Sequence, residues 1–386
     1  MIELLFWGSM ALLFYAYAGY PLLVRVLAAV RPLPVALAPH EPRVAAVILV
    51  AHNESARLAA KLETLLGQDY PSDRLRILVA SDGSTDDTVA VARAAGPRVQ
   101  VLAFAERRGK AACLNDAVEA CDEEFLVMND ARQMLSPDAV RRLLENLADP
   151  AVVAVSGELV FGQSGQADFG QGVDAYWRYE KAIRRAEAAF HSVPGVTGAI
   201  YAIRRRAFRP IPADTILDDV EIPMIAMAAG GRVVFDHRAI AYDMPSRNAS
   251  LERVRKTRTL AGNFQLLVRH PSWVLPGGHP LWWQFLSHKV LRLLGPWLML
   301  ATLLTNLFLL AQPWPYAIAF ALQMAFYGLA SIGLLVPAAL RFRLVRLCAA
   351  FLSLNWFAVL GLVEFVSNRR AHLWRASAAG SRASNP

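Results

Sequence analysis

A long segment of this chain carries no charge: from Leu293 to Leu340 the sequence contains no Asp, Glu, Lys or Arg. A helix needs about 20 apolar residues to cross the roughly 30 Å hydrocarbon core of a bilayer. The segment therefore predicts two spanning helices, Leu293–Ala311 and Tyr316–Val336, joined by a short turn. A mean hydropathy of +0.32, high for an ordinary soluble enzyme, agrees with an integral membrane protein.

A second apolar segment, Leu4–Val24, predicts an N-terminal transmembrane helix within residues 1–30. Arg25, Arg31 and Arg43 follow this segment, and no basic residue precedes it. Because Lys and Arg are enriched on the cytoplasmic side, we expect an external amino terminus and a cytoplasmic chain after about residue 31. Cysteines without CxxC spacing fit a reducing cytoplasm. The Ala- and Arg-rich composition is compatible with a bacterial inner membrane, which we take as the expected location.

Residues 293–368 are predicted to hold the C-terminal transmembrane helices. Before them, residues 280–292 predict a helix in the membrane interface, because polar residues such as His288 and Arg292 fall on one face. Leu347–Val363 is short for a full crossing, and a crossing would leave the arginines that follow it outside. We interpret this last segment as re-entrant or interfacial.

Between the apolar ends, residues 43–160 alternate between strand and helix patterns. The apolar run Val44–Leu49 stops at a polar turn, and leucines at helical spacing, Leu58, Leu62 and Leu65, follow it. Further strands are predicted at Leu75–Ala80, Val99–Phe104, Phe125–Met128 and Val152–Val155. Repeated strand–helix units predict an α/β fold, with a mostly parallel, Rossmann-like sheet covered by helices on both faces.

Three successive strand ends of this region carry acids: Glu54, Asp82 and Asp130. Ligands of open parallel sheets bind beyond the carboxyl ends of the strands, so we expect these acids to form one polar rim. A single polar residue there, such as Asn53, is otherwise explained as a helix cap. The rim lacks GxGxxG and GxxxxGK[ST], which disfavours a dinucleotide site or a P-loop.

After residue 160 the strand–helix alternation loosens. A loop at Thr197–Ala199 enters a strand, Asp218-Asp219 opens a helix, and Leu251–Leu267 predicts a basic helix. The net charge is +8, but the basic residues lie mostly beside apolar segments, without the interleaved aromatics of a nucleic-acid groove. We therefore expect anionic headgroups and anionic substrates as partners, and no nucleic acid.

Seven short motifs, in this order and spacing, are similar to those of membrane-bound family 2 glycosyltransferases, which are related to polysaccharide synthases and lipid-linked sugar transferases. The resemblance covers roughly residues 43–270 and implies a cytosolic GT-A nucleotide-sugar domain at residues 43–275. The motifs are Ala51-His52-Asn53-Glu54, Ser81-Asp82-Gly83-Ser84-Thr85-Asp86, Arg108-Gly109-Lys110-Ala111-Ala112-Cys113-Leu114-Asn115, Asn129-Asp130-Ala131-Arg132, Thr197-Gly198-Ala199, Asp218-Asp219 and Arg255-Lys256-Thr257-Arg258.

The resemblance assigns roles to these residues. It implies that Asp219 is the general base, next to Asp218, that Thr197, Gly198 and Ala199 face the acceptor, and that Asp130 holds Mg²⁺ or Mn²⁺. The residues implied to bind the nucleotide-sugar are Ala51, His52, Asn53, Glu54, Asp82, Lys110, Asn129, Asp130, Arg255 and Arg258. Two simpler interpretations remain open. Asp218-Asp219 would then only stabilise the positive end of a helix dipole, and the basic helix Leu251–Leu267 would only contact anionic lipid headgroups.

This sequence departs from the family pattern at two informative positions. Arg132 stands where the second acid of the DxD metal motif is expected, so Arg132 either contacts phosphate or leaves the metal weakly held. The (Q/R)xxRW motif ends in Thr259 instead of Trp, which argues against processive synthesis.

We therefore expect a metal-dependent, inverting glycosyltransferase that moves a sugar from a UDP-sugar to a lipid or lipid-linked acceptor at the cytoplasmic membrane face. Two alternatives remain open: a processive polysaccharide synthase of the same fold, and a silent nucleotide-sugar-binding subunit of a synthase complex. A transporter is disfavoured because the spanning segments carry almost no ionisable residues.

Overall fold

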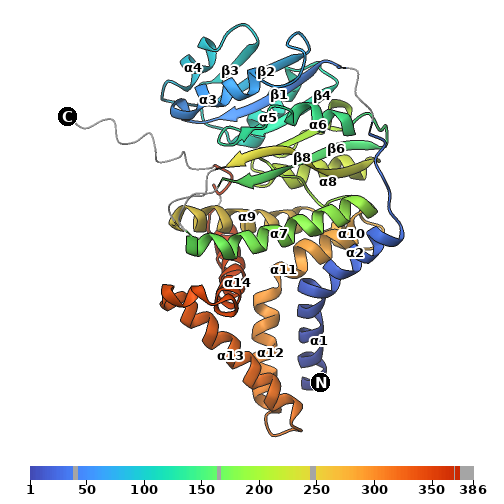
Figure 1. Ribbon diagram of the computed structural model, residues 1–386, viewed down its shortest axis with the longest axis vertical. Helices are drawn as coiled ribbons and strands as arrows, with labels where there is room; N and C mark the ends of the chain where they lie inside the picture. The colour runs from blue at the N-terminus through green and yellow to red at the C-terminus, as the bar shows by residue number, and fades with distance from the viewer. Residues whose placement is uncertain (38–41, 163–166, 244–248, 369, 374–386) are drawn as a thin grey trace, which may run out of the picture. The chain divides into compact units, whose positions relative to one another are not determined.

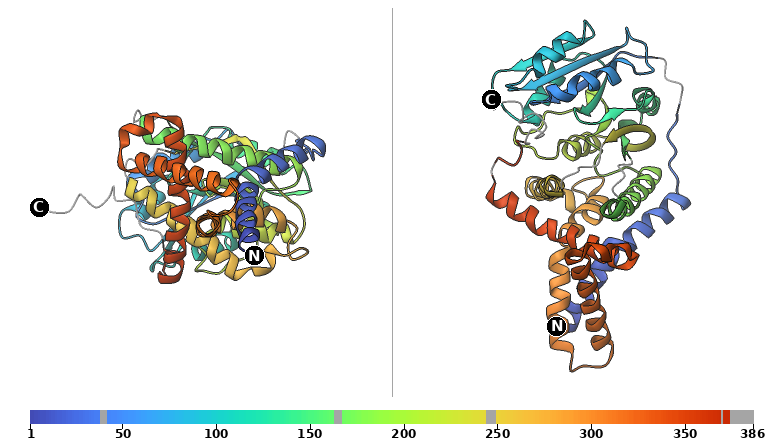
Figure 2. Two further views of the ribbon diagram at one scale, coloured as in Figure 1. Left: turned by 90° about the horizontal axis from the view of Figure 1, so that it is seen from below. Right: turned by 60° about the vertical axis from the view of Figure 1, so that its left-hand side comes forward.

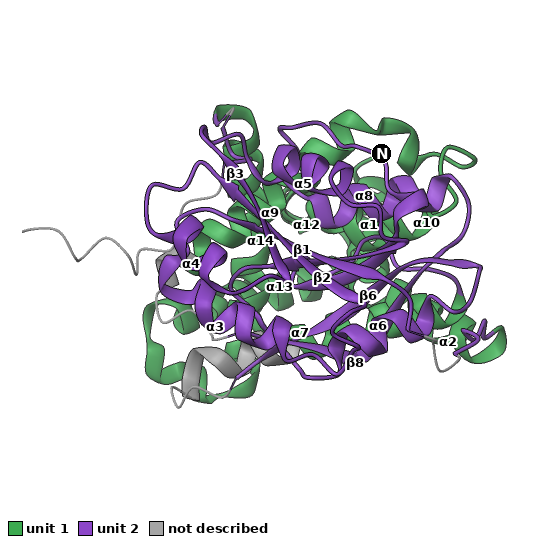
Figure 3. Cartoon of the chain, turned by 90° about the horizontal axis from the view of Figure 1, so that it is seen from above, with its two compact units in different colours: residues 1–31, 164–190, 248–367 green, residues 32–163, 191–247, 368–386 purple. Residues whose placement is uncertain are grey.

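The computed structural model describes residues 1–37, 42–162, 167–243, 249–368 and 370–373 (Figure 1). The chain forms two compact units, shown in different colours in Figure 3. We call them the sheet unit (Pro32–Gln163, His191–Arg247 and Asn368–Pro386) and the helical unit (Met1–Arg31, Ser164–Phe190 and Asn248–Ser367). The units divide the chain differently from the predicted domains, because α7 (Ala167–Phe190) and α9 (Ala249–Arg269) group with the helical unit.

The sheet unit is built on an eight-stranded mixed sheet with the order β3-β2-β1-β4-β7-β6-β8-β5. Parallel pairing joins β3, β2, β1 and β4, whereas β7 runs antiparallel to both β4 and β6. The strands are β1 (Ala45–Ala51), β2 (Leu75–Asp82), β3 (Val99–Phe104), β4 (Phe125–Asp130), β5 (Met134–Leu135), β6 (Val152–Phe161), β7 (Ile200–Arg204) and β8 (Arg232–Asp243). The predicted α/β class with a mostly parallel sheet is confirmed, since β6 and β8 also pair in parallel, but the strand–helix alternation did not predict the antiparallel strands β7 and β5.

Helices cover this sheet because each presents an apolar stripe to it. All seven residues of β1 are buried, as expected for a central strand with neighbours on both sides. Leu58, Leu62 and Leu65 of α3 are buried against the same core, which confirms their predicted helical spacing. The helices of this unit are α3 (Ser55–Leu66), α4 (Thr88–Ala94), α5 (Lys110–Glu119), α6 (Ala139–Asn146) and α8 (Asp218–Ala228), with a short 3₁₀ turn η2 (Arg205–Ala207).

The cap reading of Asn53 is wrong. The N-cap of α3 is Glu54, and Asn53 itself adopts a left-handed conformation with φ of 53°. The side-chain oxygen of Asn53 accepts a hydrogen bond from the backbone amide of Thr85 at 2.8 Å, and the backbone amide of Asn53 donates to Ser84 Oγ at 3.2 Å. Asn53 therefore links the loop after β1 to the loop after β2 by hydrogen bonds and does not cap α3.

The helical unit contains the apolar ends of the chain together with α7 and α9 (Figures 1 and 2). Within it α1 lies beside α12, and α9 packs against α14, where Gly361 lets Leu260 approach closely. Its other elements are α1 (Ile2–Phe14), η1 (Tyr15–Gly19), α2 (Tyr20–Val30), η3 (Pro271–Val274), α10 (Trp282–Phe285), η4 (Leu286–Val290), α11 (Leu291–Leu293), α12 (Gly295–Leu309), α13 (Pro315–Leu335), η5 (Pro337–Arg341) and α14 (Arg343–Ser367).

Among the residues that the structure describes, three helices are long and apolar enough to cross a membrane: Ile2–Val30, Pro315–Leu335 and Arg343–Ser367. The first two match the predicted spans. The third has 25 residues, so the predicted segment Leu347–Val363 was drawn too short, and its length no longer argues against a crossing. The predicted span Leu293–Ala311 is a 15-residue helix, bent by 60° from Trp282–Leu293, so that pair is a broken span or a re-entrant loop.

The polar face of residues 280–292 is buried inside the helical unit. His288 bridges two acids of α7, with Nδ1 at 2.8 Å from Glu187 and Nε2 at 2.9 Å from Glu180. Arg292 also pairs with Glu180, and the hydroxyl of Tyr20 donates to Glu187. Burial alone raises the pKa of Glu180, but Arg292 and His288 together hold it well below its usual range. The polar pattern that predicted an interfacial helix thus reflects an internal ionic network.

Candidate active site

The loops after β1 and β2 are joined at the polar rim. His52 follows β1 directly, is 7% exposed, and donates through Nδ1 to the backbone carbonyl of Asp82 at 2.6 Å. Because β1 and β2 are parallel neighbours, their carboxyl ends bring these residues to the same edge of the sheet, as predicted. Ala51, the last residue of β1, is buried in the same place.

The carboxylate of Asp82 orders the start of α5. Its Oδ1 accepts from the Arg108 amide at 2.6 Å, and its Oδ2 accepts from the Gly109 amide at 3.0 Å. Gly109 has φ of +94°, a conformation that favours glycine, and packs beneath His372. Asp82 is fully buried, so it fixes the turn that delivers Lys110 to the rim.

Cys113, on the first turn of α5, also faces Asp82, and its thiol donates to Oδ1 at 3.3 Å. Burial, together with the Asp82 charge, raises the pKa of Cys113 to about 12. This thiol is therefore protonated at neutral pH and is not a nucleophile of the site.

Lys110 joins two acids from different parts of the chain. Its Nζ lies 2.8 Å from Asp130 Oδ1 at the end of β4 and 2.9 Å from Asp218 Oδ2 at the start of α8. Burial lowers the pKa of Lys110, but the charges of Asp130 and Asp218 outweigh this and raise it well above the usual value. Lys110 is therefore a permanent cation at the rim.

Gly198 lies between Asp130 and Asp219. Its amide donates to Asp219 Oδ2 at 3.2 Å, and a Cβ added there would lie 3.4 Å from Asp130 Oδ2 and 3.5 Å from Asp219 Oδ2. The neighbouring residues fix the loop, because Thr197 donates to Ser156 Oγ at 3.0 Å and the Ala199 carbonyl accepts from the Asn129 side chain. The structure thus brings the predicted base, metal and acceptor residues together.

Tyr201 belongs to this cluster and was not predicted. It is fully buried on β7, and among the described residues its hydroxyl has no hydrogen-bond partner. Burial, followed by the charge of Asp218, raises the pKa of Tyr201 well above its usual value, while Lys110 opposes the shift. A neutral hydroxyl donor therefore stands near the acids. The sequence carries no signal for Tyr201, because a tyrosine within an apolar strand pattern is interpreted as an ordinary core residue.

Arg132 is held by the protein. Its guanidinium binds Asp243 at the end of β8, and Asp243 Oδ2 also accepts from Gln133 Nε2 at 2.9 Å. The charge of Arg132 also acts on Glu54: burial raises the pKa of Glu54, and the charges of Arg57 and Arg132 oppose this rise. Arg132 therefore anchors the chain after Asp130 to β8.

The donor set limits which metal the rim fits. No group of three His, Cys, Asp or Glu side chains that could hold a metal ion occurs in the described part of the chain. Asp130 is the acid at the metal-motif position, and its side chain is 37% exposed. Mg²⁺ and related hard cations bind through one or two carboxylates plus substrate phosphates, so Asp130 fits such an ion in company with a diphosphate.

Arg255 and Arg258 lie on α9 of the helical unit, where Arg255 is exposed and Arg258 half-buried. Their contact with the diphosphate stays a prediction.

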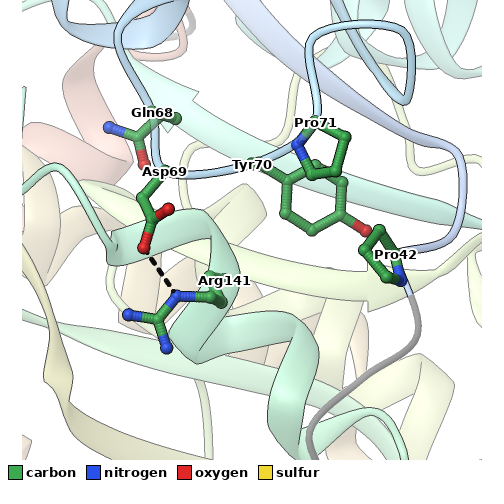
Figure 4. A pocket seen from close by; sticks show the side chains of 6 residues that line it. All are labelled: Pro42, Gln68, Asp69, Tyr70, Pro71 and Arg141. Carbon is green, nitrogen blue, oxygen red and sulfur yellow. Dashed lines mark hydrogen bonds and ion pairs between the residues drawn. The ribbon is translucent and has the colours of Figure 1, made fainter.

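A surface hollow of about 470 Å³ lies elsewhere on the sheet unit (Figure 4). The Tyr70 hydroxyl on its wall donates to the Arg43 carbonyl, just before β1 begins, and Arg141 pairs with Asp69 at 2.9 Å. The hollow therefore opens at the amino-terminal end of β1, whereas the rim lies at the carboxyl end, and we do not assign it to the active site.

Comparison with known proteins supports the same reading. The glycosyl transferase family 2 model matches residues 46–211. An N-acetylglucosaminyltransferase of Sinorhizobium fredii is 28% identical over 294 residues, covering 69% of this chain and 69% of the relative. A beta-monoglucosyldiacylglycerol synthase of Synechocystis is 26% identical over 191 residues, covering 46% of this chain and 38% of the relative. The chain spans about half the length of the first curated relatives it matches.

Among solved structures, a mannosyltransferase of Pyrobaculum calidifontis, in complex with GDP-Man and Mn²⁺, matches with a TM-score of 0.71 and 23% identity. The match covers 95% of this chain and 99% of that one. The mixed sheet of this chain thus has a GT-A-like fold. Residues 46–211 form a glycosyl transferase family 2 domain, as the resemblance of the motifs implied.

Proposed function

We propose that this enzyme transfers a sugar, with inversion, from a UDP-sugar to a lipid or lipid-linked acceptor at the cytoplasmic face of a bacterial inner membrane. The observation that carries the proposal is the convergence of Asp130 and Asp219 on Gly198, with Lys110 paired to Asp130 and Asp218. A general base, a cation and a metal-ligating acid are what displacement at a diphosphate-activated sugar requires.

In the proposed reaction, Asp219 removes the proton from the acceptor hydroxyl. The acceptor oxygen then forms a bond to the anomeric carbon while the bond from that carbon to the diphosphate oxygen breaks, so one displacement inverts the centre. The nucleoside diphosphate leaves with the electron pair, and Asp219 retains the proton. The Gly198 amide, which donates to Asp219 Oδ2, orients this carboxylate. General-base catalysis of this kind contributes about 10²–10⁴ in rate.

Lys110 is proposed to bind the diphosphate. Its pairs with Asp130 and Asp218 hold a charged ammonium at the rim before the donor arrives. A Mg²⁺ or Mn²⁺ ion on Asp130, when bound, would neutralise charge on the diphosphate. Arg255 and Arg258 are proposed to add positive charge because the guanidinium fork pairs with phosphate oxygens.

The lipid acceptor is supported by the chain's own apolar helices. Three described helices are long and apolar enough to cross a membrane, and such helices would keep the enzyme at a membrane surface. The matched Synechocystis relative is named as the synthase of a glycosylated diacylglycerol. Thr259, at the position where processive members carry Trp, favours the addition of one sugar over polymer synthesis.

The test measures nucleoside diphosphate release by the detergent-purified chain across a panel of UDP- and GDP-sugars, with native lipid extract and with or without Mn²⁺ or Mg²⁺. We expect metal-dependent release that Asp219→Asn abolishes, with a lipid product heavier by one sugar. A product ladder would identify a processive synthase instead. Nucleotide binding without release for any donor would identify a silent subunit and refute the proposal.

A further inference from the structure

Lys61 is a buried lysine that the proposed mechanism leaves unused. It lies on the apolar face of α3, between Leu58, Leu62 and Leu65, and is 0% exposed. Among the described residues it forms no ion pair, since its Nζ donates to the backbone carbonyl of Gln133. A buried amine without a carboxylate partner is costly for a fold. Its presence calls for a compensating role.

The partner of Lys61 lies in the turn that carries Asp130. This turn follows β4 and leads through Arg132 and Gln133 into β5, which pairs with β8. From the α3 side, Lys61 binds the Gln133 carbonyl. From the β8 side, the Asp243 carboxylate binds both the Arg132 guanidinium and the side-chain amide of Gln133. The turn is therefore anchored on two sides, three residues or fewer from Asp130.

We infer that Lys61 is a positioning residue for Asp130, the proposed metal-binding acid; this assignment rests on the proposed function. The anchored turn keeps the Asp130 carboxylate at the rim, where it meets Lys110 and faces Gly198. Arg132 belongs to the same anchor, which explains why an arginine is compatible with the position of a second acid. Residues that orient a metal-binding side chain typically change metal affinity 10–100-fold when they are removed.

The test uses the full chain in detergent and two variants from the same helix region. Lys61→Met removes the amine but keeps an apolar side chain of similar length. Gln68→Met is the matched control, because Gln68 is also buried and donates to the backbone carbonyl of Ser136 at 2.9 Å. Gln68 also accepts from the Val140 amide at 3.1 Å, and both partners lie farther from Asp130 in the sequence than Gln133 does. The probes are Mn²⁺ with UDP or GDP, and free Mn²⁺ is measured by electron paramagnetic resonance.

We expect Lys61→Met to weaken Mn²⁺ binding in the presence of nucleotide at least tenfold, and Gln68→Met to stay within twofold of wild type. Lys61→Gln, which keeps an N–H donor on a shorter side chain, should lose less and supplies the comparison where Lys61→Met folds poorly. Equal losses in the Lys61 and Gln68 variants, or unchanged Mn²⁺ affinity in a folded Lys61 variant, would overturn the assignment. If wild type shows no Mn²⁺-dependent nucleotide binding, the proposed function fails first.

Discussion

Replacing Lys61 by Met should stabilise the protein at low pH and not at high pH. Burial lowers the pKa of Lys61 from 10.5 in the unfolded chain to about 7 in the fold. Below pH 7 the unfolded and folded chains both bind this proton, but the fold pays for burying the charge. At 1.36 kcal/mol per pKa unit the gap corresponds to about 5 kcal/mol. The cost declines as the pH rises from about 7 to about 10.5, because the unfolded chain then binds more protons than the fold.

The variant also loses the hydrogen bond to Gln133, whose carbonyl would be left buried at a cost of about 1–3 kcal/mol. The net effect at pH 6 is therefore a gain of about 2–4 kcal/mol. At pH 9.5 only about 1.4 kcal/mol of the charge cost remains, and the two terms roughly cancel. With about 2–4 °C per kcal/mol for a unit of this size, the thermal midpoint should rise by roughly 5–15 °C at pH 6 and hardly at all at pH 9.5.

The assay compares the thermal midpoints of wild type and Lys61→Met at pH 6 and pH 9.5, in one detergent and at one scan rate. Gln68→Met serves as the control, since it loses hydrogen bonds to Thr64, Ser136 and Val140 but no titratable amine, and should shift the midpoint equally at both pH values. The reasoning is refuted if Lys61→Met shifts the midpoint by the same amount at both pH values. A more stable but weaker-binding variant would mark Lys61 as retained for function.

Three further outcomes follow from the site and the helical unit. Asp219→Asn should lower transfer by about 10²–10⁴ while UDP affinity stays within twofold, as measured by product formation and by calorimetry; unimpaired turnover would exclude Asp219 as the base. Lys110→Met should weaken UDP binding about tenfold or more, because the rim then has acids without their cation; unchanged affinity would speak against the diphosphate role. Glu180→Gln should destabilise the helical unit by about 3–5 kcal/mol at pH 7. Because the pKa of Glu180 is held low, this stabilisation is present above the unfolded value of 4.5 and is lost as the pH falls further, so the thermal midpoints of variant and wild type should converge in acid.

The parallel pairing of β1, β2, β3 and β4 could be predicted from the sequence because these strands are connected locally. β1, β2, β3 and β4 are apolar runs separated by short helical patterns, and a helix between two strands is the usual connection of parallel neighbours. β7 inserts antiparallel between β4 and β6, although it lies far from β4 in sequence. No periodicity encodes such a long-range register, so the antiparallel pairing of β7 emerged only from the structure.

The candidate site divides in the same way. Asp82 and Asp130 could be predicted because they end apolar strands, and Asp219 because it opens a helix within a known motif order. Tyr201 and Lys61 could not, because their importance depends on what lies opposite them in space. A tyrosine in an apolar strand and a lysine on an amphipathic helix are ordinary until their hydroxyl or amine proves to be buried.

The charges at the rim explain why these pieces belong together. Asp130, Asp218 and Asp219 carry a formal charge of −3, and Lys110 supplies +1 through its two ion pairs. A nucleoside diphosphate brings further negative charge to this edge, so donor binding needs more positive charge than Lys110 alone supplies. A divalent cation on Asp130 would supply this positive charge only if the Asp130 carboxylate stays at the rim and does not pair with another cation of the chain. The pairing of Arg132 with Asp243 fits this requirement, because it keeps the nearest guanidinium of the motif engaged with β8 and leaves Asp130 to the site.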